Sequence, residues 1–298
     1  MVNFLFTANE AVDFFVFFNI IKDRNRYFLY LGAQMMNTGL SLKVYMVTHG
    51  PECFEIPDYC VPIEVGAALR KNFRYELRDN LTDDNVSVKN PEWCEVTAIY
   101  WMWKHDHSDI IGLYHYRRMY RLSQKQIIRY LGKADMIATF IDKEISVAEL
   151  IRHYCPSGSL ETALEQIKEN APDYYDTAVD VLRGKWYYCC NLFVTRRDLF
   201  DAYCQWLFPL VFQIEKAAEQ KKVKDPRYMG YIVEMLLFST YIRKNRINVM
   251  HMNDCVFGRN RFVDKIVRSR FYGSPAFSFI KRRIPKKIRK IFVRSSDY

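Results

Sequence analysis

The sequence lacks the short motifs that mark the most familiar nucleotide and hydrolase sites. It has no glycine-rich phosphate loop, no GxSxG elbow, no HExxH pair and no protein-kinase signature. Its eight cysteines form no CxxC pair and no zinc-binding spacing. We therefore expect no protein-built metal site, and we expect buried thiols in a reduced, cytoplasmic compartment.

The sequence also lacks a hydrophobic run long enough to cross a bilayer, which takes about 20 residues. The stretch FFVFFNII near the N-terminus is too short, acidic residues interrupt the apolar segment, and no basic start of a signal peptide precedes it. We predict that residues 1–40 are an appendage to a domain spanning 41–258. The alternative is that translation starts at Met35 or Met36.

Most of the chain has no excess of basic over acidic residues, although the formal net charge is +10. Residues 259–298 contain thirteen Lys and Arg against two Asp, which leaves residues 1–258 with a net charge of −1. Because no basic stripe remains on the main domain, nucleic acid is not an expected partner.

Residues 259–298 have the pattern of a basic amphipathic tail. Ile284, Ile288 and Ile291 recur at helical spacing among Lys and Arg, and Pro285 can begin the helix. This pattern is typical of helices that lie on an anionic membrane surface. We expect peripheral attachment to the inner face of the plasma membrane; a solvated, disordered tail is the alternative.

Apolar runs and helical patterns alternate along the main domain. This alternation predicts an α/β fold with a mixed, mostly parallel sheet flanked by helices. The expected strands cover 42–49, 59–65, 109–114, 135–140, 186–195 and 247–252. The expected helices run from Asn90 as N-cap through Trp103, and over 122–131, 145–183, 198–219 and 228–244.

The most informative motif is His115-Tyr116-Arg117-Arg118, which directly follows the apolar strand core 110–113. Open α/β sheets bind ligands at the carboxyl ends of their strands. Arg forms bidentate hydrogen bonds to phosphate. The motif therefore predicts a site for an anionic ligand, with phosphate as the leading candidate; two arginines in surface salt bridges are the alternative.

A loop rich in Asp and Asn precedes the predicted helix 90–103 and the strand that ends in the basic motif. Asp83, Asp84, Asn85 and Asn90 carry oxygens and amides that could bind sugar hydroxyls, a ribose or a metal. The same residue types also favour ordinary turns. The loop is a candidate binding segment only in combination with the basic motif.

Glu234 lies in the otherwise apolar helix RYMGYIVEMLLFSTYI. A carboxylate in such surroundings needs a reason, because burial without a partner is costly. Desolvation raises the pKa of a carboxyl group towards neutrality and suits it to general-base catalysis. The alternative is a structural carboxylate paired with Arg227 or an arginine of the tail.

Between residues 42 and 258 the chain contains, in order, VYMVTH, VPIEVGAAL, LRDNLTDDNVSVKN, WCEVTAIYWMWK, IIGLYHYRRMY, NLFVTRRDLFDAYCQWLFPLVF and RYMGYIVEMLL. In these blocks it resembles the bacterial family of capsular and exopolysaccharide glycosyltransferases long known only as a domain of unknown function. The resemblance implies a GT-A-like, Rossmann-like nucleotide-sugar-binding sandwich. It also implies a hexosyltransferase that uses UDP-galactofuranose or another UDP-hexose.

The resemblance implies a role for each candidate residue. Glu234 is the expected catalytic base. Arg117 and Arg118 are expected to hold the donor diphosphate where the usual Asp-x-Asp metal motif is missing, so we predict no cofactor; a divalent metal is the alternative. The other expected substrate-binding residues are Thr48, His49, Asp83, Asp84, Asn85, Asn90, Glu95, His115, Asn191 and Arg227.

The expected acceptor is a growing capsular, exopolysaccharide or lipopolysaccharide O-antigen glycan, often on a lipid carrier. An inverting single displacement is the simplest mechanism. The alternative from another class is a non-catalytic nucleotide- or glycan-binding scaffold in a polysaccharide assembly complex. A sugar-phosphate transferase is the second enzymatic alternative.

Overall fold

A computed structural model describes residues 39–50, 55–252 and 255–257. The predicted N-terminal appendage lies outside these residues except for its last two positions, and the predicted basic tail lies wholly outside them. In the described part of the chain, every helix is too short or too polar to cross a membrane.

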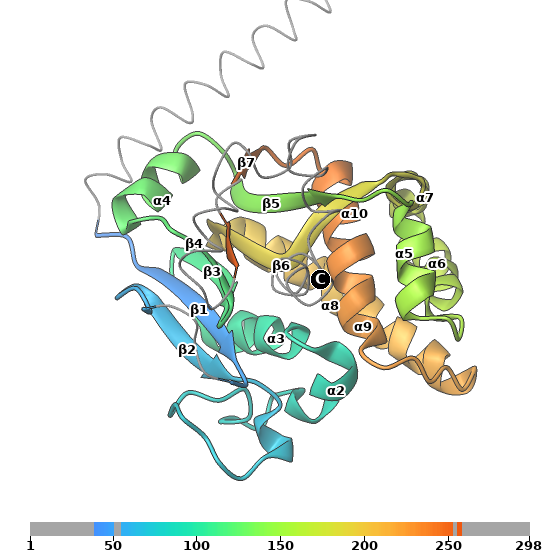
Figure 1. The fold of residues 1–298 in the computed structure, drawn as a ribbon, viewed down its shortest axis with the longest axis horizontal. Helices are drawn as coiled ribbons and strands as arrows, with labels where there is room; N and C mark the ends of the chain where they lie inside the picture. Colours follow the sequence, from blue (N-terminus) through green and yellow to red (C-terminus); the bar gives the residue numbers. More distant parts are fainter. Residues whose placement is uncertain (1–38, 51–54, 253–254, 258–298) are drawn as a thin grey trace, which may run out of the picture.

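A single mixed sheet forms the centre of the domain, and helices pack around it (Figure 1). Its strands are β1 Leu42–Thr48, β2 Cys60–Glu64, β3 Ile110–His115, β4 Arg118–Tyr120, β5 Met136–Asp142, β6 Trp186–Arg196, β7 Val249–His251 and β8 Cys255–Phe257. The helices are α2 Asn90–Trp93, α3 Val96–His105, α4 Gln124–Leu131, α5 Val147–Tyr154, α6 Ser159–Asn170, α7 Pro172–Arg183, α8 Arg197–Gln220, α9 Tyr228–Ile232 and α10 Phe238–Lys244. Short turns of 3₁₀ helix occur at η1 Ala67–Leu69 and η2 Ser87–Lys89.

The strand order is β2-β1-β3-β6-β5-β7, with β4 pairing β3 and β8. Strands β2, β1 and β3 are parallel to one another, β5 is parallel to β7, and β6 runs against both of its neighbours. Along that order β6 alone is therefore reversed. This arrangement confirms the predicted mixed, mostly parallel sheet flanked by helices.

Strands β1 and β3 form the centre of the sheet because their side chains are apolar on both faces. Val44, Met46, Ile111 and Leu113 are completely buried. Gly112 permits the close approach of β3 to β6, since a Cβ at this position would lie 2.7 Å from the carbonyl oxygen of Phe193.

The predicted helix from Asn90 to Trp103 is wrong in one respect, because the chain breaks it into α2 and α3. Cys94 adopts φ 53° and ψ −131°, which no helix can accommodate. Asn90 lies inside the first turn rather than at the N-cap, and its side-chain amide donates to the Cys94 carbonyl oxygen at 2.7 Å.

Two further helical predictions hold in outline and differ in detail. The segment 145–183 is three helices, and α5 begins with a capping box in which Ser146 and Glu149 bond each other's main-chain N–H groups. The segment 228–244 is continuous but contains a π-helical turn, η3 Val233–Leu237. Such turns recur at functional sites, and this one carries Glu234.

Candidate active site

The carboxyl ends of β1 and β3 lie side by side in the middle of the sheet. The two strands are parallel, with Val47 opposite His115, and the Tyr116 N–H donates to the Val47 carbonyl oxygen at 3.0 Å. The rings of His49 and Tyr116 meet edge to face at 5.1 Å. Because β2 lies on one side of β1 and β3 on the other, the connections diverge here, as at the switch points where such sheets bind ligands.

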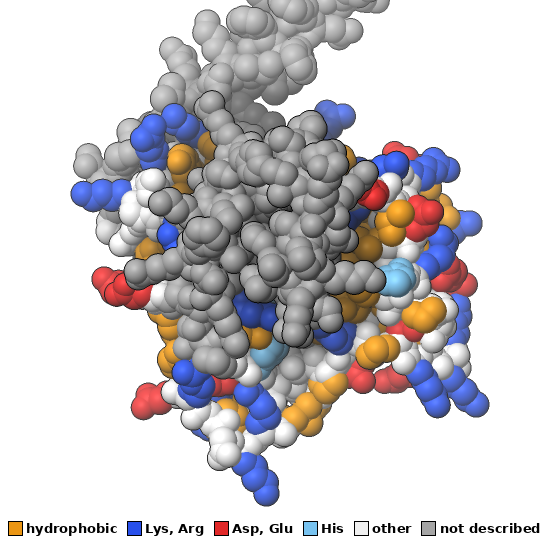
Figure 2. All heavy atoms as spheres, viewed as in Figure 1, with side chains coloured by type: hydrophobic (Ala, Val, Ile, Leu, Met, Phe, Trp, Pro, Cys, Tyr) orange, Lys and Arg blue, Asp and Glu red, His pale blue; other side chains and the backbone are white. Residues whose placement is uncertain are grey.

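A pocket of about 280 Å³ opens at this place. It brings together predicted site residues from the end of β3, the turn into β4, α2, the π turn, and the positions that adjoin β1, α3 and α9. In the face shown in Figure 2, Lys and Arg side chains gather beside a histidine near the middle of the molecule. The predicted residues that line the pocket are His49, Asn90, Glu95, His115, Arg117, Arg118, Arg227 and Glu234.

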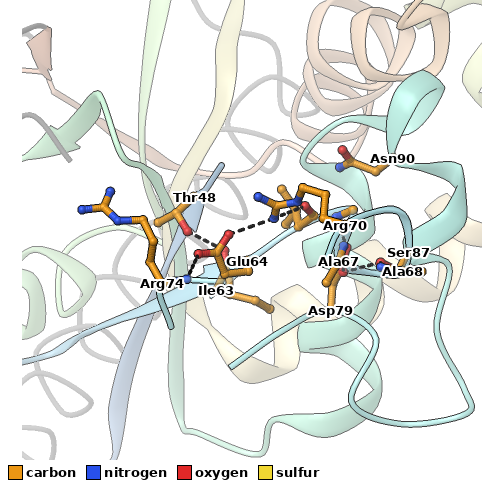
Figure 3. Close-up of polar contacts among 12 residues, drawn as sticks. Thr48, Ile63, Glu64, Ala67, Ala68, Arg70, Arg74, Asp79, Ser87 and Asn90 are labelled. Atoms are coloured by element: carbon orange, nitrogen blue, oxygen red, sulfur yellow. Dashed lines mark hydrogen bonds and ion pairs between the residues drawn. The ribbon is translucent and has the colours of Figure 1, made fainter. Parts of the chain in front are cut away.

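Five predicted binding residues lie outside the pocket lining: Asn191, which is described below, and four others. The Thr48 side chain is completely buried between β1 and β2, and its hydroxyl donates to the Ile63 carbonyl oxygen at 3.4 Å (Figure 3). Asp83 and Asp84 are exposed, and Asp84 accepts a hydrogen bond from the Tyr100 hydroxyl at 2.6 Å. Asn85 bonds within its own turn, to the Thr82 carbonyl oxygen at 2.5 Å.

Two buried carboxylates, Glu64 and Asp79, hold the loop that follows β2 (Figure 3). Asp79 accepts hydrogen bonds from the N–H groups of Gly66 and Ala67 at 2.9 and 3.1 Å, from the Thr97 hydroxyl at 2.8 Å, and from Ser87. Glu64 pairs with Arg70 at 2.8 Å. Asp79 thus accepts four hydrogen bonds, and Glu64 accepts from the Arg70 side chain and the Arg74 N–H, so both groups serve the fold.

The pocket has a strongly basic side. Arg117 is exposed with its guanidinium over the Tyr116 ring at 5.0 Å, Arg118 is half-buried at the start of β4, and Arg227 lies at the rim. Desolvation lowers the pKa of His49, and the charges of Arg117, Arg70 and Arg227 lower it further. Several positive charges thus converge on one face, which suits a polyanionic ligand.

His115, on the basic side of the pocket, is neutral. Burial, together with the charge of Arg118, lowers its pKa to about 3. Its Nε2 lies 2.7 Å from the Cys190 carbonyl oxygen. Because a carbonyl oxygen only accepts, Nε2 carries the proton, and the ring links the end of β3 to β6.

Besides these basic groups, the pocket contains two carboxyl groups, Glu95 and Glu234. Burial and the charge of Glu234 raise the pKa of Glu95 to about 7, although a 2.8 Å hydrogen bond from the Asn191 amide lowers it in part. Burial also raises the pKa of Glu234, against the Cys190 N–H bond and the charge of Arg118. Glu95 is therefore poised to exchange a proton near neutral pH, and Glu234 binds a proton more tightly than an exposed carboxylate does.

Asn191 itself is buried outside the pocket lining and reaches the site through Glu95. It follows Cys190 in β6, and the two residues have left-handed φ values of 47° and 65°. This conformation costs non-glycine residues about 1–2 kcal/mol each. The surrounding structure must enforce it, as is common at functional sites.

Arg227 is held at the rim by the broken helix. Its Nε donates to the Cys94 Sγ at 3.2 Å, and burial raises the pKa of that thiol to about 12, so it stays neutral. A Cβ at Gly230 would lie 2.8 Å from the same sulfur. The position of Arg227 therefore depends on a glycine one turn along α9.

An aromatic wall was not predicted. Tyr154 and Tyr231 both line the pocket, and their rings stack at 4.8 Å with an interplanar angle of 14°. Arg227 lies over the Tyr231 ring at 5.4 Å. The spacing of Arg227, Tyr231 and Glu234 at i, i+4 and i+7 was the available signal, because it places all three on one helical face.

Within residues 39–50, 55–252 and 255–257, no group of three or more His, Cys, Asp or Glu side chains is arranged to hold a metal ion. The pocket's own carboxyls are Glu95 and Glu234. Arginine guanidinium groups are its most numerous charged groups.

Comparison with known proteins gives two matches. The model of a family described as a domain of unknown function, DUF4422, matches residues 43–246, more than half of the chain. The apo structure of the WbbM bifunctional glycosyltransferase is similar at 27% sequence identity with a TM-score of 0.61. That similarity covers 74% of this chain and 46% of the WbbM chain, so this chain spans less than half the length of WbbM. No curated protein matches the sequence.

Proposed function

The chain belongs to the DUF4422 family, and from this premise we propose that it is a glycosyltransferase of GT-A type. The observation that carries the proposal is the pocket at the ends of β1 and β3, which joins three arginines to two carboxyls of raised pKa. A nucleoside diphosphate sugar needs both: cations for its diphosphate and a base for the incoming hydroxyl.

In this proposal Arg117 and Arg118 bind the donor diphosphate, and His49 borders the nucleotide. The two guanidinium groups stabilise the charge that develops on the leaving group, which is the task of a divalent metal in other transferases. Their position supports the assignment, because both follow the carboxyl end of β3 and line the pocket. The donor is a UDP-hexose, with UDP-galactofuranose as one candidate.

Glu234 acts as the general base. The acceptor hydroxyl gives its proton to the Glu234 carboxylate, and its oxygen forms a bond to the anomeric carbon of the donor sugar. The bond from that carbon to the diphosphate breaks, and its electron pair leaves with the nucleoside diphosphate. The raised pKa of Glu234 supports this role, since a carboxylate of higher pKa is a stronger base.

The stacked pair Tyr154 and Tyr231 provides an apolar platform for a sugar ring. Pockets of this kind commonly combine aromatic walls with a few placed polar groups. Tyr231 lies on the helix that also carries Glu234, so we assign the platform to the acceptor, a capsular, exopolysaccharide or O-antigen glycan.

Attachment to an anionic membrane through residues 259–298 is part of the proposal and rests on the sequence pattern alone. Co-sedimentation of the full chain with anionic vesicles tests it. Equal binding to neutral vesicles would contradict an electrostatic tail.

The deciding experiment measures binding and hydrolysis of a panel of nucleotide sugars by the wild type, Glu234→Gln and Arg117→Ala. We expect one donor to be hydrolysed, a rate loss of roughly 10²–10⁴-fold in Glu234→Gln without loss of donor binding, and weaker donor binding in Arg117→Ala. Binding without turnover by the wild type, with every donor and acceptor, would favour the scaffold function instead.

Activity measured in EDTA distinguishes diphosphate binding by Arg117 and Arg118, the arginine clamp, from catalysis by a divalent metal. The proposal expects activity to persist in EDTA, because Arg117 and Arg118 neutralise the diphosphate. Loss of activity in EDTA with recovery on adding Mn²⁺ would overturn the clamp and leave the glycosyltransferase assignment intact.

A further inference from the structure

Residues 189–192 of β6 pair with neither of the two neighbouring strands, β3 and β5. Strand β6 pairs β3 through residues 193–196, and it pairs β5 through 186–188 and again through 193–195. A register shift in β5, between Ala138 and Phe140, accompanies the gap. The main-chain groups of this short segment are thus available for other partners.

Cys190 and Asn191 use that freedom to contact three pocket residues from three different elements. The Cys190 N–H donates to Glu234 in the π turn at 2.8 Å, and its carbonyl oxygen accepts from His115 of β3 at 2.7 Å. The Asn191 Nδ2 donates to Glu95 beside α3 at 2.8 Å. A regular strand would direct consecutive groups to opposite faces, so the left-handed pair is what lets both carboxyls be held from one point.

We propose that Cys190–Asn191 is the positioning element of the carboxyl pair, and that the Asn191 amide holds Glu95 where its charge acts on Glu234. Glu234 is the group that takes the acceptor proton, so the catalytic consequence rests on the proposed glycosyltransferase function. Asn191 touches no substrate in this account; it acts through Glu95.

The balance of charges around the pair shows why Asn191 matters. Glu234 faces Glu95 and the opposing charges of Arg118, Arg227 and Lys143. Glu95 faces Glu234 and Arg227, and the neutral titratable neighbours of the pair include Cys94, Tyr187 and the Cys190 thiol. The Asn191 bond favours the ionised form of Glu95, and an ionised Glu95 makes Glu234 a stronger base.

The test is a titration of the two carboxyl groups by carbon NMR on glutamate-labelled protein without substrate. Glu95→Gln and Glu234→Gln assign the two signals. In Asn191→Gly we expect the Glu95 step to move up by about one pH unit and the Glu234 step to move down, since one unit corresponds to the loss of one hydrogen bond to a charged group. Glycine retains the left-handed conformation, so this variant should fold.

Lys222→Gly is the matched control. Lys222 also has a left-handed φ, of 56°, but it is exposed beyond the end of α8 and outside the pocket lining. Its substitution by glycine should leave both titration steps unchanged. Titration curves of Asn191→Gly that superimpose on those of the wild type would overturn the proposal.

Glu234→Gln gives a second, independent measurement if Asn191→Gly does not fold. It keeps the shape of the side chain and removes the charge that raises the pKa of Glu95, so the Glu95 step should fall; an unchanged step contradicts the coupling. None of these measurements uses a nucleotide sugar. A failure of glycosyl transfer would therefore be visible separately, as shifted titration steps in a protein that turns over no donor.

Discussion

Asp79 and Glu95 are buried carboxyl groups within the same domain and Glu234 is a half-buried one, and the surroundings of Asp79 differ sharply from those of the other two. Asp79 accepts two main-chain N–H bonds and two hydroxyl bonds. Glu95 accepts hydrogen bonds from the Asn191 amide and from its own main-chain N–H, and Glu234 accepts one from the Cys190 N–H. A carboxylate whose donors are complete stabilises the fold, whereas one with few donors keeps a raised pKa and remains available for chemistry.

The largest effect on stability is expected at Asp79. Asp79→Asn places an amide group against the N–H groups of Gly66 and Ala67, so it should lower the free energy of unfolding by about 2–4 kcal/mol. Glu95→Gln, the matched change in the pocket, should stay within about 1 kcal/mol of the wild type. Urea unfolding of both variants measures this. Equal losses would break the distinction between structural and functional carboxyls.

The next effect is a dependence of stability on pH that comes from His115. Its pKa is about 3 in the folded protein and ordinarily 6.5, so between these values the unfolded chain binds more protons. The contribution of His115 is therefore complete above about pH 6.5 and is lost as the pH falls towards 3. His49, whose pKa is also lowered, acts in the same direction.

His115→Gln isolates this contribution, because glutamine can still donate to the Cys190 carbonyl oxygen. The difference in melting temperature between about pH 7.5 and about pH 5 should be smaller in the variant than in the wild type. An identical pH dependence in the two proteins would show that His115 is not buried as a neutral ring.

The basic half of the site could be predicted from the sequence because two local signals coincide there. An apolar strand core ends directly before His115-Tyr116-Arg117-Arg118, and strand ends in such sheets point to the ligand. Strand and helix positions followed similarly from apolar periodicity. The motif needed no knowledge of distant parts of the chain.

The acidic loop shows the limit of this reasoning. Asp83, Asp84 and Asn85 have suitable side chains, but turns rich in Asp and Asn satisfy those groups locally. The Asn85 side chain bonds the Ser87 N–H at 3.1 Å, and the Tyr100 hydroxyl donates to Asp84. Composition alone does not tell a binding loop from a turn that has used its own polar groups.

The bend in β6 could not have been predicted. WYYCCNLFVT has the appearance of a continuous buried strand, and nothing in it signals left-handed residues at Cys190 and Asn191. The conformation is fixed by partners distant in the sequence, namely His115, Glu95 and Glu234. Tertiary contacts of this kind override local preference.

The central claim is that the pocket binds a nucleoside diphosphate through Arg117 and Arg118, and calorimetric titration with UDP tests it most directly. The wild type should bind UDP, and the double variant Arg117→Ala/Arg118→Ala should lose at least about 10²-fold in affinity, since each bond to a charged group contributes about 1.5–3 kcal/mol. Asp84→Asn, on the exposed loop away from the pocket lining, serves as the control and should bind as the wild type does. Equal affinity of the double variant and the wild type would contradict the account.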